Sequence, residues 1–428
     1  MPIVEPFRAL TFAPALRGEL DRLVAPPYDV ITESERQRLA SHPGNIVHLD
    51  LPRAEGGADP YAWASGQLRR FVADRILVRE DHRAFYILDQ RFTDPAGGER
   101  VRRGFFARLR LEPFEAGVVI PHERTLQRPR EDRQRLLAAT RTHLSAVFLL
   151  HPDPGGEVAR ILERASTGRP GAQARDREGT VSRMVSLDDP AVLASIADRL
   201  APAWALIADG HHRYESALAY RDARRSEGSA DAEHLLVFLC SLADPGLTIF
   251  PIHRLVRGLP SFDPGSFCER LAAFFSLTPF DSGPALQSAL RGKAGRPGSF
   301  GMVLAGEERH FLLEWREGAG FDRGEMAAIP PPLRRLDVIL LHRLVLEATL
   351  GITIEAQAQQ SHLDYVKDDE ELFRRVGQGL AQIGFALNPT RMEQVIEVSR
   401  SGLRLPQKST YFYPKVPTGF VLDPLDPA

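Results

Sequence analysis

The spacing of hydrophobic residues changes repeatedly along the chain between the period of a helix and that of a buried strand. Short apolar runs predict strands at 84–89, 104–111, 144–150, 204–208, 235–242, 300–304, 310–315 and 383–387. Apolar residues three and four positions apart predict helices at 61–75, 130–142, 191–200, 211–225, 333–350, 368–381 and 390–402. The first fifty residues are rich in proline and are predicted to be irregular. The mixture predicts an α/β (mixed α+β) fold.

A chain of 428 residues exceeds what one hydrophobic core usually holds, so we expect two domains. The pattern is interrupted by glycine and proline at Gly258-Leu259-Pro260, which is the candidate boundary. We therefore predict an N-terminal catalytic and phosphate-binding domain, residues 1–258, and a C-terminal α/β domain, residues 259–428. The tail of the second domain is expected to be able to return to the active site.

Composition and charge exclude several classes of protein. No apolar stretch approaches the ~20 residues that cross a bilayer, and the N-terminus lacks the pattern of a signal peptide. Cys240 and Cys268 cannot form a disulfide framework and are most simply buried thiols in a reducing compartment. The net charge of −2 gives no electrostatic footprint for nucleic acid. We expect a cytoplasmic protein without nucleic-acid or membrane partners, and a homodimer as the base-rate oligomer.

The turn after the predicted strand 204–208 is the strongest candidate for chemistry. Asp209 and Gly210 lead into a helix, whose first amides and dipole form an anion site. Yet His211, His212 and Arg213 place cationic or potentially cationic groups at this positive helix end. Each placement costs ~0.3–1 kcal/mol when charged. A bound anion would reverse that sign, and Arg213 can hold a phosphate with two hydrogen bonds.

An alternative interpretation of this turn needs no ligand. One histidine would pack in the core, and Arg213 would pair with a nearby carboxylate of the chain itself. We favour the phosphate interpretation because three such residues share one helix end.

His122 and Glu123 form a second candidate cluster, in a loop that Pro121 opens. Loops at the rim of a sheet often carry general bases and metal ligands. The spacing is not that of a zinc protease, because no histidine follows four residues after His122. The alternative is a solvated loop in which Glu123 makes a surface ion pair. The charged run that includes Arg133 is interpreted as an exposed helix face.

Two further clusters lie nearer the C-terminus. His253 and Arg254 can add positive charge to the same cleft, or they merely cap a strand. Lys408, Ser409 and Thr410 belong to a dense polar and aromatic stretch that can fold back over a site. The alternative for this stretch is an ordinary edge segment with its aromatic rings packed on the core.

These motifs resemble a bacterial and archaeal family of domains of unknown function, the one numbered ten-fifteen. The shared elements are PFRAL, APPYDV, HERT with the later EDR, ADGHHRY, PIHR and KSTYFYPK. At a more distant level, ADGHHRYESAL resembles the phosphate-binding box of the ParB/sulfiredoxin superfamily, which includes an archaeal free serine kinase. The resemblance implies a ParB/sulfiredoxin-like mixed-sheet core with an additional α/β C-terminal region, and a phosphate grip at residues 210–213. This chain departs from the usual ParB box, which has Glu-Arg where His211-His212 stand here.

The resemblance implies a nucleotide-dependent kinase of serine metabolism that uses ATP or ADP and Mg²⁺ and phosphorylates free L-serine. Glu123 with His122 would then act on the acceptor hydroxyl, and Asp209 would bind Mg²⁺. Arg254, Lys408, Ser409 and Thr410 would hold the substrate carboxylate.

Two other functions stay open. One is a metal-dependent hydrolase using His122, Glu123, His211 and His212, although adjacent histidines on a helix diverge by about 100°. The other is a ParB-like regulatory protein that binds nucleotide without turnover.

Overall fold

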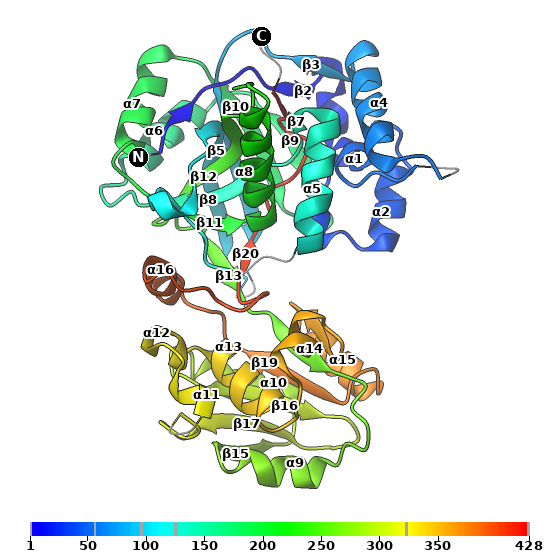
Figure 1. Cartoon of the computed structure of the whole chain (residues 1–428), viewed down its shortest axis with the longest axis vertical. Coiled ribbons are helices and arrows are strands. Elements are labelled where there is room, and N and C mark those ends of the chain that lie inside the picture. The colour runs from blue at the N-terminus through cyan, green and yellow to red at the C-terminus, as the bar shows by residue number, and fades with distance from the viewer. Residues whose placement is uncertain (1, 55–56, 95–96, 124–126, 322–323, 426–428) are drawn as a thin grey trace. The chain divides into compact units, whose positions relative to one another are not determined.

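The computed structural model describes residues 2–54, 57–94, 97–123, 127–321 and 324–425. The chain forms two compact units, each with its own sheet (Figure 1). The first contains residues 1–121, 125–248 and 414–428, and the second contains residues 122–124 and 249–413. The main boundary thus lies between residues 248 and 249, before the expected boundary at residue 258, and residues 122–124 and 414–428 belong to the unit that is distant in sequence.

The first unit is built on a mixed sheet of nine strands within the described residues. Its strands in spatial order are β6 (Val119–Ile120), β11 (Ala205–Asp209), β8 (Val147–His151), β12 (His234–Ser241), β5 (Glu99–Arg110), β4 (Phe85–Thr93), β10 (Val181–Leu187) and β9 (Ala172–Arg175), and β1 (Val4–Glu5) pairs with β5. The pairs β8–β12 and β6–β11 are parallel and the remaining pairs are antiparallel. The α/β fold class is therefore confirmed.

Side chains alternate across this sheet, so each strand supplies two layers of core. One face packs against helices that include α6 (Glu157–Ser166), α7 (Pro190–Leu200) and α8 (His211–Ser226). Asp189 caps α7 by accepting from the amides of Ala191 and Val192, and Pro190 begins the helix. Helix α5 (Gln127–Thr140) lies beside α8 (Figure 1).

Segments from the two ends of the chain pair with the middle of the first unit. Strand β2 (Leu10–Phe12) pairs with β3 (Leu77–Arg79), and β21 (Asp423–Pro424) pairs with β7 (Thr142–His143). The carboxylate of Asp423 is fully buried and accepts three hydrogen bonds of 2.6–2.9 Å from Arg108 of β5. This ion pair holds the C-terminal segment, including Lys415, in the first unit.

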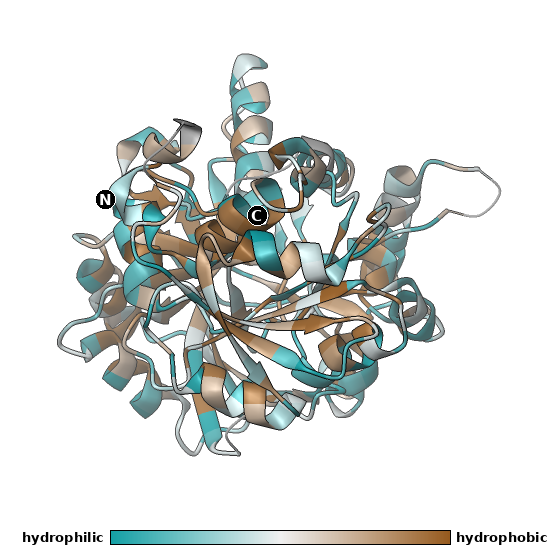
Figure 2. Ribbon diagram, turned by 90° about the horizontal axis from the view of Figure 1, so that it is seen from below, coloured by the Kyte–Doolittle hydropathy of each residue, from teal (hydrophilic) through white to brown (hydrophobic). Residues whose placement is uncertain are grey.

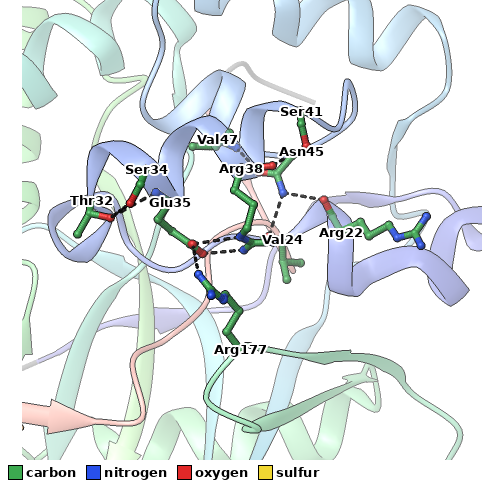
Figure 3. Close-up of polar contacts among 10 residues, drawn as sticks. All are labelled: Arg22, Val24, Thr32, Ser34, Glu35, Arg38, Ser41, Asn45, Val47 and Arg177. Atoms are coloured by element: carbon green, nitrogen blue, oxygen red, sulfur yellow. Dashed lines mark hydrogen bonds and ion pairs between the residues drawn. The ribbon is translucent and has the colours of Figure 1, made fainter.

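The first fifty residues are more ordered than predicted, because they contain α1 (Leu20–Leu23), α2 (Glu33–Ala40) and α3 (Val47–Asp50), and α4 (Pro60–Ala73) follows. The buried amide of Asn45 fastens this segment (Figure 3). Its Nδ2 donates to the carbonyls of Arg22 at 2.6 Å and Val24 at 3.2 Å, and its Oδ1 accepts from the amide of Val47. These tertiary bonds fix the start of the stretch that carries Tyr28.

The second unit contains an antiparallel sheet of six strands within the described residues. Their order is β15 (Phe275–Phe280), β17 (His310–Trp315), β16 (Ser299–Leu304), β19 (Ile383–Leu387), β14 (His253–Val256) and β18 (Leu363–Val366). Helices α10 (Gly283–Arg291) and α15 (Asp369–Gly377) pack on one face of this sheet. Other helices of the unit include α9 (Pro264–Leu271), α11 (Gly324–Ala327), α14 (Ile354–Ala358) and α16 (Met392–Arg400). Strand β13 (Thr248–Phe250) pairs with β20 (Tyr411–Tyr413). Figure 2 shows mainly hydrophobic strands and more hydrophilic outer helices.

The predicted hairpin 300–304 with 310–315 is confirmed by β16 and β17, but the single helix predicted at 333–350 is wrong. The stretch instead forms α12 (Pro331–Arg334), α13 (Asp337–Leu340) and a π-helical turn, Leu341–Glu347. The break falls at Leu336, whose backbone is extended. Asp337 begins the new helix and accepts a 2.7 Å hydrogen bond from the amide of Gly298. A tertiary contact therefore overrides the helical pattern.

Two glycine substitutions test this description of the first unit. A Cβ added to Gly104 of β5 would lie 2.4 Å from the carbonyl oxygen of Leu239, whereas one at Gly66 of α4 meets nothing closer than 4.0 Å. We expect Gly104→Ala to destabilise the protein by about 2 kcal/mol or more, and Gly66→Ala to stabilise it by about 0.5–1 kcal/mol. Calorimetric unfolding of both variants measures this. Equal unfolding temperatures for the two would contradict the packing of β5 against β12.

Candidate functional site

The turn between β11 and α8 has the conformation that the sequence predicts. Gly210 is the N-cap residue with φ +95°, and having no side chain it makes no capping hydrogen bond to α8. The first turn of the helix contains no acidic residue. A Cβ at Gly210 would lie 2.9 Å from Nε of Arg213, so only glycine lets that guanidinium fold back over the turn.

Asp209 holds two cations at this turn. Its Oδ2 lies 2.5 Å from Nη2 of Arg213, and its Oδ1 lies 2.5 Å from Nζ of Lys415. Arg213 also donates from Nη1 to the carbonyl of Ala146. Burial raises the pKa of Asp209, but the charges of Lys415 and Arg213 outweigh burial and hold that pKa below its ordinary value. The three side chains form a charged cluster, here called the Asp209 clamp.

The clamp changes the interpretation of the positive helix end. Arg213 pairs with a carboxylate of the chain itself, as the alternative interpretation had it, so the charge on the helix end does not by itself demand a ligand. Asp209 nevertheless offers one negative charge to two cations. The Nε atom of Arg213 is buried and has no hydrogen-bond partner among the described residues. The side chain of Arg213 is only 9% exposed.

A second layer of residues lies behind Arg213. Arg133 is 6% exposed, and its Nη1 lies 3.2 Å from Oδ1 of Asp50, while its guanidinium carbon lies 4.0 Å from the ring centre of Tyr28. The interpretation of Arg133 as part of an exposed face is therefore wrong. Burial raises the pKa of Asp50, against the lowering effect of Arg133. Arg133, Asp50 and Arg213 line a cavity of only about 40 Å³, which is too small for a nucleotide.

A different polar cluster lies within the second unit. His122 is fully buried, and its Nε2 lies 2.8 Å from the hydroxyl of Thr410. Oε1 of Glu123 accepts a 2.5 Å hydrogen bond from the amide of Lys408, and Oε2 lies 3.9 Å from Nε2 of His122. The amide of Leu405 donates to the carbonyl of His122. His122 and Glu123 are thus joined side by side with residues 405–410, here called the KST segment.

Arg254 is the cation of this second cluster. It is almost fully buried and donates to two carbonyls, those of Ile252 and Lys408, the latter at 3.0 Å. Its guanidinium carbon lies 5.3 Å from the ring centre of Tyr365. Burial lowers the pKa of Arg254 to about 10, which leaves it charged at neutral pH. Burial, reinforced by Arg254, lowers the pKa of His342 to about 3, so that histidine is neutral.

The remaining predicted residues are placed as follows. His211 is buried and His212 is half-buried, both on α8. The hydroxyl of Ser409 donates to the carbonyl of Pro406 at 2.6 Å. Lys408 has φ +58°, and its backbone makes the contacts described above. Residues 124 and 125 of the HERT motif lie outside the described residues.

Each of the two carboxylate oxygens of Asp209 pairs with a cation, one with Lys415 and the other with Arg213. The expectation that Asp209 binds Mg²⁺ stays a prediction, which would require one of these cations to move. Within the described residues, no three His, Cys, Asp or Glu side chains gather as a metal site. The hydrolase residues divide between the units, with His122 and Glu123 in the second and His211 in the first.

Sequence reasoning missed the partners that hold the grip residues. Lys415 belongs to the motif KSTYFYPK, but nothing in the sequence marks it, or Tyr28, Asp50 and Arg133, as a partner of the turn. A signal existed for three of them, because APPYDV, EDR and KSTYFYPK were among the shared motifs. The motifs do not indicate which residues form ion pairs or hydrogen bonds with each other.

Comparison with known proteins gives one family and several distant structures. A family model described as "Protein of unknown function (DUF1015)" matches residues 4–339. No curated protein matches the sequence significantly. Among the described residues, none of the helices has the length and apolar character needed to span a membrane.

Three of the similar solved structures have TM-scores of 0.34–0.35. A free serine kinase in complex with AMP is 14% identical, with TM-score 0.35, over 74% of this chain and 92% of that one. A conserved hypothetical protein from Pyrococcus furiosus is 16% identical, with TM-score 0.34, over 75% of this chain and 95% of that one. SbnI from Staphylococcus aureus, truncated at its C-terminus, is 11% identical, with TM-score 0.34, over 74% of this chain and 87% of that one. Likenesses at this level say nothing of which ligand this chain binds.

The Asp209 clamp predicts a pH-dependent loss of stability. Because folding lowers the pKa of Asp209, its stabilising effect is present above the unfolded value of about 3.9 and is lost as the pH falls below it. Asp209→Asn leaves the buried Arg213 and the half-buried Lys415 without their carboxylate, which costs about 3–5 kcal/mol at neutral pH. The difference in unfolding temperature between the wild type and Asp209→Asn should shrink as the pH falls from 7 towards 3.

The matched control is Asp222→Asn, which removes an exposed carboxylate that pairs with Arg221 on the same helix. Its effect on the unfolding temperature should be small at every pH. A difference for Asp209→Asn that stays constant with pH would contradict the assigned ion pairs.

Proposed function

The chain belongs to the DUF1015 family, and on that premise we propose that it binds ATP or ADP by its phosphates at the start of α8. We further propose that it transfers a phosphoryl group to a small hydroxyl metabolite, with free L-serine as the specific acceptor.

The observation that carries the proposal is the composition of the α8 turn. Gly210, the N-cap residue of α8, has no side chain that could cap the helix, and the helix begins directly after Asp209 of the clamp. An anion at this turn would accept hydrogen bonds from the amides and would be attracted by the positive charges of Lys415 and Arg213. Because the cavity behind Arg213 holds only about 40 Å³, the phosphates would contact the helix start rather than enter that cavity.

The clamp also suits the chemistry of phosphoryl transfer. This reaction depends mainly on positioning and on positive charge near the transferred group, with little covalent participation by the protein. Asp209 immobilises Arg213 and Lys415 before a ligand arrives, so their charges need no rearrangement during the reaction. Asp209 would thus act as a positioning residue.

The second unit supplies candidates for the acceptor. Glu123 would orient or deprotonate the hydroxyl, with His122 beside it as a neighbouring proton carrier. Arg254, Lys408, Ser409 and Thr410 would hold the carboxylate of the metabolite. Serine is chosen because ADGHHRYESAL resembles the box of the free serine kinase.

Removal of the grip arginine tests nucleotide binding. We expect Arg213→Ala to weaken ATP and ADP binding by at least about 100-fold, since a charged hydrogen-bond donor to phosphate is lost. The control is Arg221→Ala, a buried arginine of the same helix that also donates to a backbone carbonyl and pairs with an aspartate. Calorimetric titration of both variants measures the effect. Normal nucleotide affinity in Arg213→Ala would show that the grip has been assigned wrongly.

Turnover is tested separately through Glu123. The Glu123→Gln variant keeps an oxygen that can accept from the amide of Lys408, so the fold and nucleotide binding should persist. Formation of O-phosphoserine from serine and ATP or ADP should fall by about 100-fold or more, the scale of a lost general base. Glu314→Gln, which neutralises the partner of Lys293 in the same unit, is the control and should keep full activity. Nucleotide binding without any phosphoserine in the wild type would instead identify a regulatory protein.

A further inference from the structure

A second cavity of the first unit is lined by arginines that the proposed function does not use. Its volume is about 600 Å³, within the range of roughly 300–1,000 Å³ that small-molecule sites occupy. Four arginines line the cavity, together with the loop that follows α8. They are Arg8 of the PFRAL motif, Arg79 of β3, Arg83 of the loop between β3 and β4, and Arg108 of β5. None of the residues of the Asp209 clamp belongs to this lining.

Three of the four guanidiniums have no carboxylate partner among the described residues. Arg108 is neutralised by Asp423. Arg8 donates from Nε to the carbonyl of Glu80, which is uncharged. Nε of Arg79 is buried and has no hydrogen-bond partner among the described residues. No ion pair joins Arg8, Arg79 or Arg83 to an acid in the described part of the chain.

The two acids on the cavity wall are already engaged by other arginines. Asp231 lies 2.6 Å from Arg141 and 2.9 Å from Arg224. Glu233 accepts two hydrogen bonds from Arg225, at 2.7 and 2.5 Å. Arg141, Arg224 and Arg225 neutralise the two acids from outside the cavity lining. The charges of Asp231 and Glu233 are therefore not available to offset the arginines of the cavity.

We propose that this cavity, here called the arginine cavity, binds a small anion that carries two or more phosphate groups. Positive charges that face one cavity repel each other. An anion bound between them would attract each guanidinium and so offset that repulsion. The planar guanidinium matches a phosphate with two parallel hydrogen bonds, which favours phosphate over a single monovalent ion. The whole chain has a net charge of −2, so a general excess of positive charge does not explain the cluster.

Inorganic pyrophosphate is the probe, and the number of ions bound per full-length chain is measured by calorimetry. Because Arg83 is exposed, Arg83→Glu changes the charge of the cavity without removing a buried contact. We expect it to remove one bound pyrophosphate per chain, and Arg79→Ala to weaken the same site. The control is Arg69→Glu on α4, an equally exposed charge reversal outside the cavity, which should bind as the wild type does.

The inference is independent of the proposed kinase function, and the Arg213→Ala variant separates the two. One pyrophosphate should still bind to Arg213→Ala if the arginine cavity is a site of its own. Loss of all binding in Arg213→Ala, an unchanged number in Arg83→Glu, or an equal loss in Arg69→Glu would each overturn the inference. Binding of double-stranded DNA, but not of pyrophosphate, that depends on Arg83 would overturn it as well.

Discussion

The first unit depends on one buried carboxylate that holds two cations from distant parts of the chain. Asp209 ends β11, Arg213 belongs to the first turn of α8, and Lys415 arrives from the C-terminal segment. A buried cation without a partner is costly, so these groups stabilise the unit only as a set. The clamp fixes the start of α8, and with it the amides and the guanidinium that are proposed to meet a phosphate.

The same requirement explains how the tail is held. The half-buried Arg108 and the buried Asp423 form a second ion pair, which fastens β21 beside β7 and brings Lys415 within reach of Asp209. Asn45 holds the N-terminal segment with neutral groups, because its side-chain amide forms hydrogen bonds with two backbone carbonyls and one backbone amide. Polar groups that are buried must find partners, and here the partners are segments far apart in sequence.

Buried positive charge is handled differently in the second unit. Arg254 is held by the carbonyls of Ile252 and Lys408 rather than by a direct carboxylate contact. Burial therefore lowers the pKa of Arg254. Burial also acts to lower the pKa of Arg213, but Asp209 and neighbouring acids outweigh it and raise that pKa above its ordinary value. Glu123 and His122 lie in the same cluster, joined to the KST segment by hydrogen bonds. The motifs of the chain thus sort into two polar clusters, one in each unit.

The sequence alone determined the α/β class, the family, the strand–turn–helix at residues 205–226 and the residue types of the candidate site, because these follow from local periodicity and short motifs. It did not reveal that Arg133 is buried against Asp50, that the helix expected at 333–350 breaks at Leu336, or that Asp209 pairs with Lys415. Each of these is decided by a contact between residues distant in sequence. A pattern of hydrophobic and polar positions reports which face of an element is buried, but it cannot report what that face meets. Only the tertiary structure pairs each buried charge with its partner.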